Sequence, residues 1–276
     1  MSGGFLEQMA RGSRERLRAA QRLRSHSALE DALRQLPPAP VLRRHASGFD
    51  LIAELKLRSP AQGQLKGADE DVAARVLAYA AGGAAAVSVL TEPQRFDGTL
   101  AHLESAAQVL RALHVPAMRK DFLVDPYQVL EARVAGAGGV LVILRMLPRG
   151  ETEALIECAR KLGLFVLLEA FDEADLELMD ELIGAAPPGA QLLAGLNCRD
   201  LATLQVVPQR LLELAPRLPQ GVPRVAESGV TTVAEATAVA RAGYQLILVG
   251  SALMQGAEPG SLAAGLLAAG RAALGR

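Results

Sequence analysis

The sequence predicts an α/β fold, a (β/α)8 TIM barrel preceded by an N-terminal helical extension. Eight short apolar runs recur after residue 49, segments of helical period separate them, and the runs are continuous rather than alternating. Continuous apolar strands are typical of a parallel sheet that is buried on both faces. Strands separated by helices form right-handed βαβ units, and eight such units close a barrel.

The first part of the chain, 1–48, is predicted to be a helical extension that packs on the barrel. Apolar residues recur at helical spacing over 5–25, beside an Arg-rich face. A second helix is predicted over 28–36 and ends before Pro37, because proline restricts the residue that precedes it. The extension and the barrel, 49–276, are expected to form one structural domain.

The repeating units follow in order along the rest of the chain. The predicted strands cover 51–55, 86–90, 115–118, 140–144, 165–168, 192–196, 224–226 and 246–249. The predicted helices cover 69–81, 100–113, 126–135, 152–162, 172–182, 208–214 and 232–242. An open doubly wound sheet is the competing architecture, but no Gly-x-Gly-x-x-Gly turn follows the first strand.

The composition argues against nucleic-acid and membrane partners and indicates a small-molecule ligand. The formal net charge is -1, so no global basic field points to nucleic acid or to an anionic membrane. No stretch reaches transmembrane length, and the N-terminus has no continuous apolar region typical of a signal peptide. Cys158 and Cys198 are too few for a disulfide framework and lack the spacing of metal ligands. A cytoplasmic protein is expected.

Charged residues stand where the predicted strands end. These are Glu54, Lys56, Lys120, Glu169 and Glu227, in a chain with only four lysines. The carboxyl ends of barrel strands open on one face, which carries the chemistry of such folds. Burying three carboxylates and two lysines together is costly for stability alone. The cluster therefore predicts acid–base catalysis at this face.

The last two strands end in glycine and serine, at Ser228-Gly229 and Gly250-Ser251. Small residues let backbone N–H groups approach an anion, and phosphate sites recur after the last two strands of such barrels. The two sites together indicate a phosphorylated ligand. Arg199 either supports this anion or forms a surface ion pair.

Phe96 and Phe122 follow strand ends in a chain whose aromatic content is only 3%. A flat apolar wall at the mouth would hold an aromatic ligand, although core packing is the more common fate of a phenylalanine. The residues alone leave both interpretations open.

Taken in order, the strand ends resemble those of the indole-3-glycerol phosphate synthase family of tryptophan biosynthesis. The resemblance covers nearly the whole chain, including the N-terminal helices. The matching stretches are Ile52-Ala53-Glu54-Leu55-Lys56 with Ser59-Pro60, Leu90-Thr91-Glu92 with Phe96-Asp97-Gly98-Thr99, Arg119-Lys120-Asp121-Phe122, Leu168-Glu169, Gly195-Leu196-Asn197-Cys198-Arg199-Asp200-Leu201, Ala226-Glu227-Ser228-Gly229 and Leu248-Val249-Gly250-Ser251.

The resemblance implies a carboxy-lyase that acts on 1-(2-carboxyphenylamino)-1-deoxyribulose 5-phosphate. The ring carbon that bears the carboxylate attacks the ketone, and CO2 and water then leave. By position, Lys120 is expected to protonate the ketone oxygen, and Lys56 to attract anionic groups and serve as a second acid. Glu169 is expected to transfer the proton of the dehydration step. Glu54, Asn197 and Glu227 are expected to hold the lysines and the substrate hydroxyls in place.

The resemblance also implies a set of substrate-binding residues and no cofactor or metal. A monomer or weak homo-oligomer is expected, with no nucleic acid or membrane partner. Phosphate is assigned to the last two strand ends, and the anthranilate ring to the two phenylalanines. The full binding set is Ser59, Phe96, Phe122, Arg199, Leu201, Ser228, Gly229, Leu248, Gly250 and Ser251.

Departures from the family pattern leave alternatives open. Cys198 replaces an asparagine or alanine after the sixth strand. Ala61 replaces a serine after the first strand, and the first helix lacks the lysine that the family commonly carries around residues 12–16. One alternative is therefore a diverged paralogue that acts on a modified anthranilate. A sugar-phosphate isomerase could use Glu54 and Glu169, but would leave the lysines unexplained. A non-catalytic phosphate-binding barrel is the third, and loss of a catalytic side chain would favour it.

Overall fold

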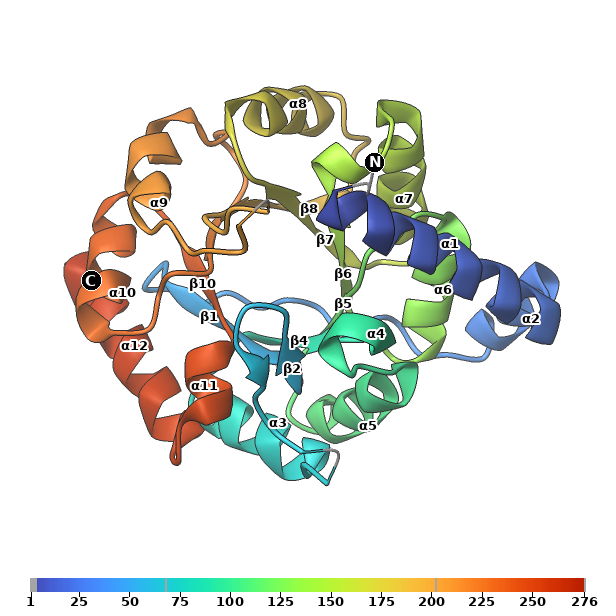
Figure 1. Cartoon of the computed structure of the whole chain (residues 1–276), viewed down its shortest axis with the longest axis horizontal. Coiled ribbons are helices and arrows are strands. Elements are labelled where there is room, and N and C mark those ends of the chain that lie inside the picture. The colour runs from blue at the N-terminus through green and yellow to red at the C-terminus, as the bar shows by residue number, and fades with distance from the viewer. Residues whose placement is uncertain (1–3, 68, 202, 276) are drawn as a thin grey trace.

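The computed structural model describes residues 4–67, 69–201 and 203–275, and its centre is a closed barrel of parallel strands (Figure 1). The hydrogen-bonded order is β1-β10-β9-β8-β7-β6-β5-β4, and β4 closes on β1. The fold class predicted from the sequence is therefore confirmed. The barrel strands are β1 (Asp50–Leu55), β4 (Ala86–Leu90), β5 (Ala117–Lys120), β6 (Gly139–Ile143), β7 (Phe165–Ala170), β8 (Gln191–Asn197), β9 (Arg224–Glu227) and β10 (Leu246–Val249).

Helices surround this barrel as a ring (Figure 1). The larger ones are α3 (Val72–Ala81), α5 (Leu100–Arg111), α6 (Pro126–Val134), α7 (Arg149–Lys161), α8 (Glu173–Gly184), α9 (Gln209–Leu214), α10 (Val233–Arg241) and α12 (Pro259–Ala273). Short elements decorate the loops: the hairpin β2 (Arg58–Ser59) with β3 (Gly63–Gln64), α4 (Pro93–Phe96), α11 (Ser251–Gln255), and the 3-10 turns η1 (Leu144–Met146) and η2 (Ala215–Arg217).

Alternation along the strands produces two apolar layers. In β1, Leu51 and Ala53 pack outward against the helices, whereas Ile52 belongs to a separate inner cluster with Met118 and Leu167. All six residues of β1 are buried, which explains why the strand reads as one continuous apolar run broken only by charges. Inward-facing positions near the strand ends are thus the places where polar side chains meet inside the barrel.

The helix starts carry local signals that fix where each loop ends. Thr232 and Glu235 form a capping box at α10, and Asp125 caps α6 ahead of Pro126. Asp172 caps α8 in the same way. These caps hold the short loops after β5, β7 and β9, which surround the mouth of the barrel.

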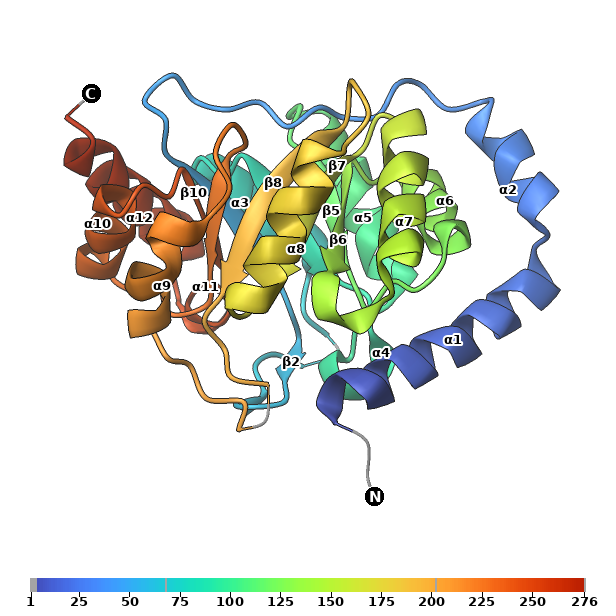
Figure 2. The same ribbon diagram turned by 90° about the horizontal axis from the view of Figure 1, so that it is seen from above.

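The extension consists of α1 (Phe5–Leu23) and α2 (His26–Leu33). Figure 2 shows α1 at the same end of the barrel as α4 and β2, while the segment between α2 and β1 runs across the opposite end. The buried face of α1 carries Met9, and the buried Ser13 accepts a hydrogen bond from Gln128 of α6 (2.9 Å). Residues 1–3 of the predicted extension lie outside the described residues.

Several helices and strands begin or end at other residues than predicted, and one of these differences affects the site. The third strand was predicted over 115–118, but β5 spans Ala117–Lys120. Val115 donates its backbone N–H to Leu110 at the end of α5 and so belongs to the preceding turn. Lys120 is therefore the last residue of the strand rather than part of a loop.

No helix within the described ranges is long and apolar enough to cross a membrane.

Candidate active site

A cavity of about 360 Å³ opens at the carboxyl ends of the barrel strands. It brings together all sixteen of the site residues predicted from the sequence. The strand ends supply Glu54, Lys56, Ser59, Phe96, Lys120, Phe122, Glu169, Asn197, Arg199, Leu201, Glu227, Ser228, Gly229, Leu248, Gly250 and Ser251.

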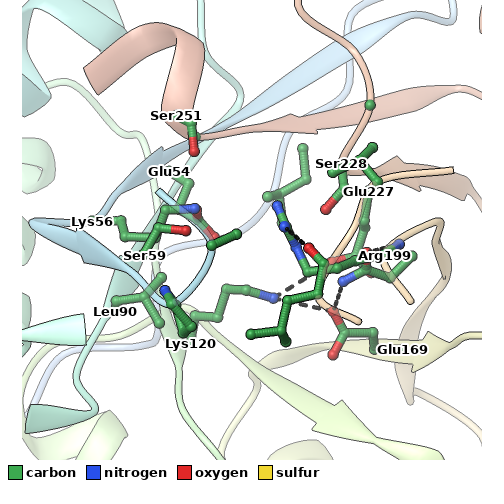
Figure 3. Close-up of a pocket in the computed structure, with 18 of the residues that line it drawn as sticks. Glu54, Lys56, Ser59, Leu90, Lys120, Glu169, Arg199, Glu227, Ser228 and Ser251 are labelled. Carbon is green, nitrogen blue, oxygen red and sulfur yellow. Dashed lines mark hydrogen bonds and ion pairs between the residues drawn. The ribbon is translucent and has the colours of Figure 1, made fainter. Parts of the chain in front are cut away.

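Lys120 is the centre of the charged cluster (Figure 3). From the end of β5 its Nζ donates to Glu169 Oε1 on β7 (3.2 Å) and lies 3.6 Å from Glu227 Oε2 on β9. Asn197, at the end of β8, donates its Nδ2 to the same Glu169 oxygen (2.8 Å). Three strands far apart in the sequence thus hold one ammonium group inside the cavity.

Lys56 forms a second ion pair on the neighbouring side of the mouth. Its Nζ donates to Glu54 Oε1 at 2.6 Å, and both side chains are buried. Glu54 belongs to β1 and points inward, while Lys56 follows directly after the strand. The cavity therefore presents two separate lysine–carboxylate pairs to a ligand.

Arg199 fixes the loop that follows β8. Its backbone N–H donates to Asn197 Oδ1 (3.0 Å), and its guanidinium donates to the carbonyl of Leu204 (2.8 Å). The side chain is thus held by its own loop, and it borders the cavity as a third cation.

Burial and charge shift the pKa values of three of these groups. Burial opposes the charged form of Lys120, but Glu169, Glu227 and Glu54 together raise its pKa. Burial also opposes the ionised Glu54, yet Lys56 and Lys120 outweigh it and lower the pKa of that carboxyl. For Glu227, burial and the nearby Glu169 raise the pKa well above its ordinary value. Burial and the neighbouring charges therefore favour the protonated form of Lys120 and, in the same direction, that of Glu227.

Three cations, Lys56, Lys120 and Arg199, line the cavity together with the carboxyl groups of the charged cluster. Within the described chain, neither carboxyl oxygen of Glu227 has a hydrogen-bond partner. A buried polar group without a hydrogen-bond partner is costly unless a ligand supplies one, and the site therefore suits a ligand with a hydroxyl near Glu227.

Two glycines make room for the carboxylates. A Cβ at Gly195 would overlap Oε1 of Glu227, and a Cβ at Gly250 would overlap Oε1 of Glu54. A side chain at Gly195 would displace the carboxylate of Glu227, and one at Gly250 would displace that of Glu54.

The ends of β9 and β10 form the polar side of the cavity opposite the β5–β7 side (Figure 3). Ser228 and Gly229 both have positive φ, 65° and 70°, so the chain turns sharply after β9. Cys198 is buried directly beside Gly229, where a Cβ would come within 2.9 Å of the cysteine sulfur. The departure at Cys198 therefore packs behind the turn.

The opposite side of the cavity is aromatic and apolar. Phe96 and Phe122 lie 6.1 Å apart between ring centroids, and Phe5 of α1 meets Phe122 edge-on at 5.9 Å. Both predicted phenylalanines line the cavity, so their role is not limited to packing in the core.

Sequence reasoning missed the other apolar residues of the cavity, among them Leu141, Ile143, Phe171 and the α1 residues Phe5 and Leu6. Alternation along β6 could have identified Leu141 and Ile143, which share one face of that strand. The two α1 residues had no such signal, because only the tertiary path of the helix brings its first turn to the mouth.

Replacing Glu227 with glutamine is expected to stabilise the fold in a pH-dependent way. A carboxyl whose pKa is raised on folding favours the folded state below its ordinary pKa, and this contribution is lost as the pH rises through the raised value. The variant should match the wild type near pH 4 and exceed it at pH 8 by about 1 kcal/mol, or about 2–4 °C in Tm. Calorimetry at both pH values measures the difference in stability, and the exposed Glu213→Gln is the control. A Glu227→Gln variant that loses more stability relative to the wild type at pH 8 than near pH 4 would contradict the expectation.

The fold and the cavity define a class: a (β/α)8-barrel enzyme whose cavity carries lysine–carboxylate pairs beside two strand ends made of glycine and serine. The profile of the family described as "Indole-3-glycerol phosphate synthase" matches residues 6–264. A protein of that name from Parafrankia sp. is 41% identical over 96% of both chains. Another from Rhodococcus opacus is 38% identical over 96% of this chain and 95% of its own. The chain belongs to the indole-3-glycerol phosphate synthase family.

Among solved structures, thiamine phosphate pyrophosphorylase from Pyrococcus furiosus has a TM-score of 0.59 and 18% identity, covering 82% of this chain and 98% of its own. This likeness supports the barrel fold alone. Family membership does not favour the isomerase, the non-catalytic barrel or the diverged paralogue.

Proposed function

We propose that this chain converts 1-(2-carboxyphenylamino)-1-deoxyribulose 5-phosphate into indole-3-glycerol phosphate, CO2 and water in tryptophan biosynthesis. The observation that carries the proposal is the ammonium group of Lys120, held by Glu169 and Glu227 between an aromatic wall and a Gly-Ser end of one cavity. The family to which the chain belongs supports the same reaction.

The chemistry of the cavity suggests how such a substrate would lie. Phe96 and Phe122 would wall the anthranilate ring, together with Leu248 and Leu201. Ser228, Gly229, Gly250 and Ser251 would bind the phosphate, with Ser59 and Arg199 completing the polar lining. The carboxylate and the ketone would then fall between Lys56 and Lys120, which places the ring carbon near the carbon that it attacks.

Ring closure needs a proton at the ketone oxygen. As the ring carbon bonds to the ketone carbon, Lys120 would donate that proton and leave a hydroxyl group. Release of CO2 returns the bonding electrons to the ring. In the final step the hydroxyl leaves as water with a proton from Lys56, while Glu169 accepts a proton from the adjacent carbon. Glu54 and Asn197 would hold Lys56 and Glu169 in position, and Glu227 would form a hydrogen bond with a substrate hydroxyl.

The extension and the barrel would act as one catalytic domain, since α1 supplies Phe5 and Leu6 to the cavity formed by residues 49–276. We expect the enzyme to work in the cytoplasm as a monomer or weak homo-oligomer, on a soluble phosphorylated substrate.

The proposal is tested by indole fluorescence after the substrate is mixed with purified protein in the presence of EDTA. A signal that rises with time and saturates with substrate is expected, because the proposed steps use only side chains of the chain. Tight substrate binding without a fluorescent product would contradict the proposal.

A further inference from the structure

We infer that Arg16 of α1 is a positioning residue that fixes the aromatic wall of the cavity from outside it. This inference rests on the proposed function, because it gives Phe96 and Phe122 the task of holding the substrate ring. Arg16 is not among the described residues that line the cavity. Its effect would pass through two buried carboxylates.

Arg16 bridges the ends of two barrel strands. Its Nη2 donates to Asp121 Oδ1 (2.8 Å), after β5, and its Nη1 lies 3.4 Å from Glu92 Oε1, after β4. Both carboxylates are fully buried, whereas the side chain of Arg16 is 25% exposed. It reaches them from the same face of α1 as Met9, Gly12 and Ser13, which are all buried.

Each of these carboxylates holds the backbone that carries one phenylalanine. Glu92 accepts the N–H groups of Gln94 (2.9 Å) and Arg95 (2.7 Å) and so caps α4, whose last residue is Phe96. Asp121 accepts the N–H group of Phe122 (2.8 Å) on the same oxygen that Arg16 contacts. One guanidinium group therefore joins the two supports of the aromatic wall.

The two carboxylates differ in how far they depend on Arg16. Asp121 also accepts from Thr91 Oγ1 (2.7 Å) and Arg119 Nη2 (3.1 Å). In the described chain, Glu92 has no ion-pair partner except Arg16. Removing Arg16 would leave a buried carboxylate without a counter-charge, and α4 would be the first element to move. A second cavity of about 240 Å³ lies beside Arg16, Thr91 and Asp121 and gives these side chains room to shift.

Removal of Arg16 should therefore weaken substrate binding and leave the rate of the chemical step nearly unchanged. Lys120, Glu169 and Glu227 are held by one another and make no contact with Arg16. Arg16→Ala should therefore raise KM about tenfold while kcat stays within about threefold of the wild type. Arg16→Lys keeps the charge but replaces the two-pronged guanidinium with a single ammonium, so KM should rise about threefold.

The test compares kcat and KM of the wild type, Arg16→Ala, Arg16→Lys and the control Arg18→Ala, an exposed arginine on the same helix. If Arg16→Ala does not fold, Arg16→Lys carries the test. The inference is overturned if the Arg16 variants keep the wild-type KM, if the loss lies in kcat, or if Arg18→Ala has the same effect. A wild-type protein without turnover would instead overturn the proposed function, and this inference with it.

Discussion

Replacement of Lys120 with methionine is expected to lower kcat by about 10³-fold, within the roughly 10²–10⁴-fold that a positioned general acid contributes. Methionine fills a similar volume but has no proton to donate. The expected loss is large because three carboxylates surround this ammonium and raise its pKa, so that it stays charged despite burial. Because these carboxylates cluster around Lys120, we expect this lysine to be the main general acid of the site.

Measurement of kcat by indole fluorescence checks this expectation, and circular dichroism checks that the variant is folded. Lys161→Met is the matched control, because Lys161 is an exposed lysine of α7 that pairs only with Glu157 in the described chain. Turnover of Lys120→Met within about tenfold of the wild type would remove Lys120 from the acid role.

Replacement of Glu169 with glutamine is the second large effect, with an expected loss of about 10²-fold in kcat. Glutamine keeps the shape and can still accept from Asn197, but it neither accepts a proton nor carries a charge beside Lys120. Because the charge of Glu169 is the largest of the influences that raise the pKa of Lys120, that pKa should fall in the variant. The protonated lysine is then lost at a lower pH.

The basic limb of the kcat profile should therefore shift to lower pH in Glu169→Gln, in addition to the drop at its maximum. Steady-state kcat from pH 6 up to the highest pH at which the protein stays folded measures both effects. The exposed Glu173→Gln of α8 is the control. A variant with full activity, or one whose basic limb moves to higher pH, is incompatible with the proposed pairing of Glu169 and Lys120.

Much of this site could be predicted because its residues follow buried strands in fixed order. Glu54, Glu169 and Glu227 each end an apolar run, and the barrel topology then brings such ends together whatever their separation in the sequence. The register of β5 was harder to predict from the sequence. Val115 and Pro116 extend its apolar run backwards, while the strand runs forward through Arg119, which bonds to α6 on the outside of the barrel, and Lys120, which lines the cavity.

The docking of α1 could not be derived from local pattern. An Arg-rich helix face predicts exposure, and Arg14 and Arg18 are indeed exposed. Arg16 instead continues the buried face of Met9, Gly12 and Ser13. What distinguishes it is the pair of buried carboxylates that it meets just after β4 and β5, and that pairing exists only in the folded chain.

The most direct test of the proposed reaction follows the substrate carboxylate by NMR, with that carbon labelled with ¹³C. If the cavity closes the ring on the ketone, the label should leave as CO2 or bicarbonate in equal amount to the indole-3-glycerol phosphate that appears. A phosphorylated product that keeps the labelled carboxylate would contradict the proposed reaction, and would indicate that Glu54 and Glu169 serve isomerisation instead.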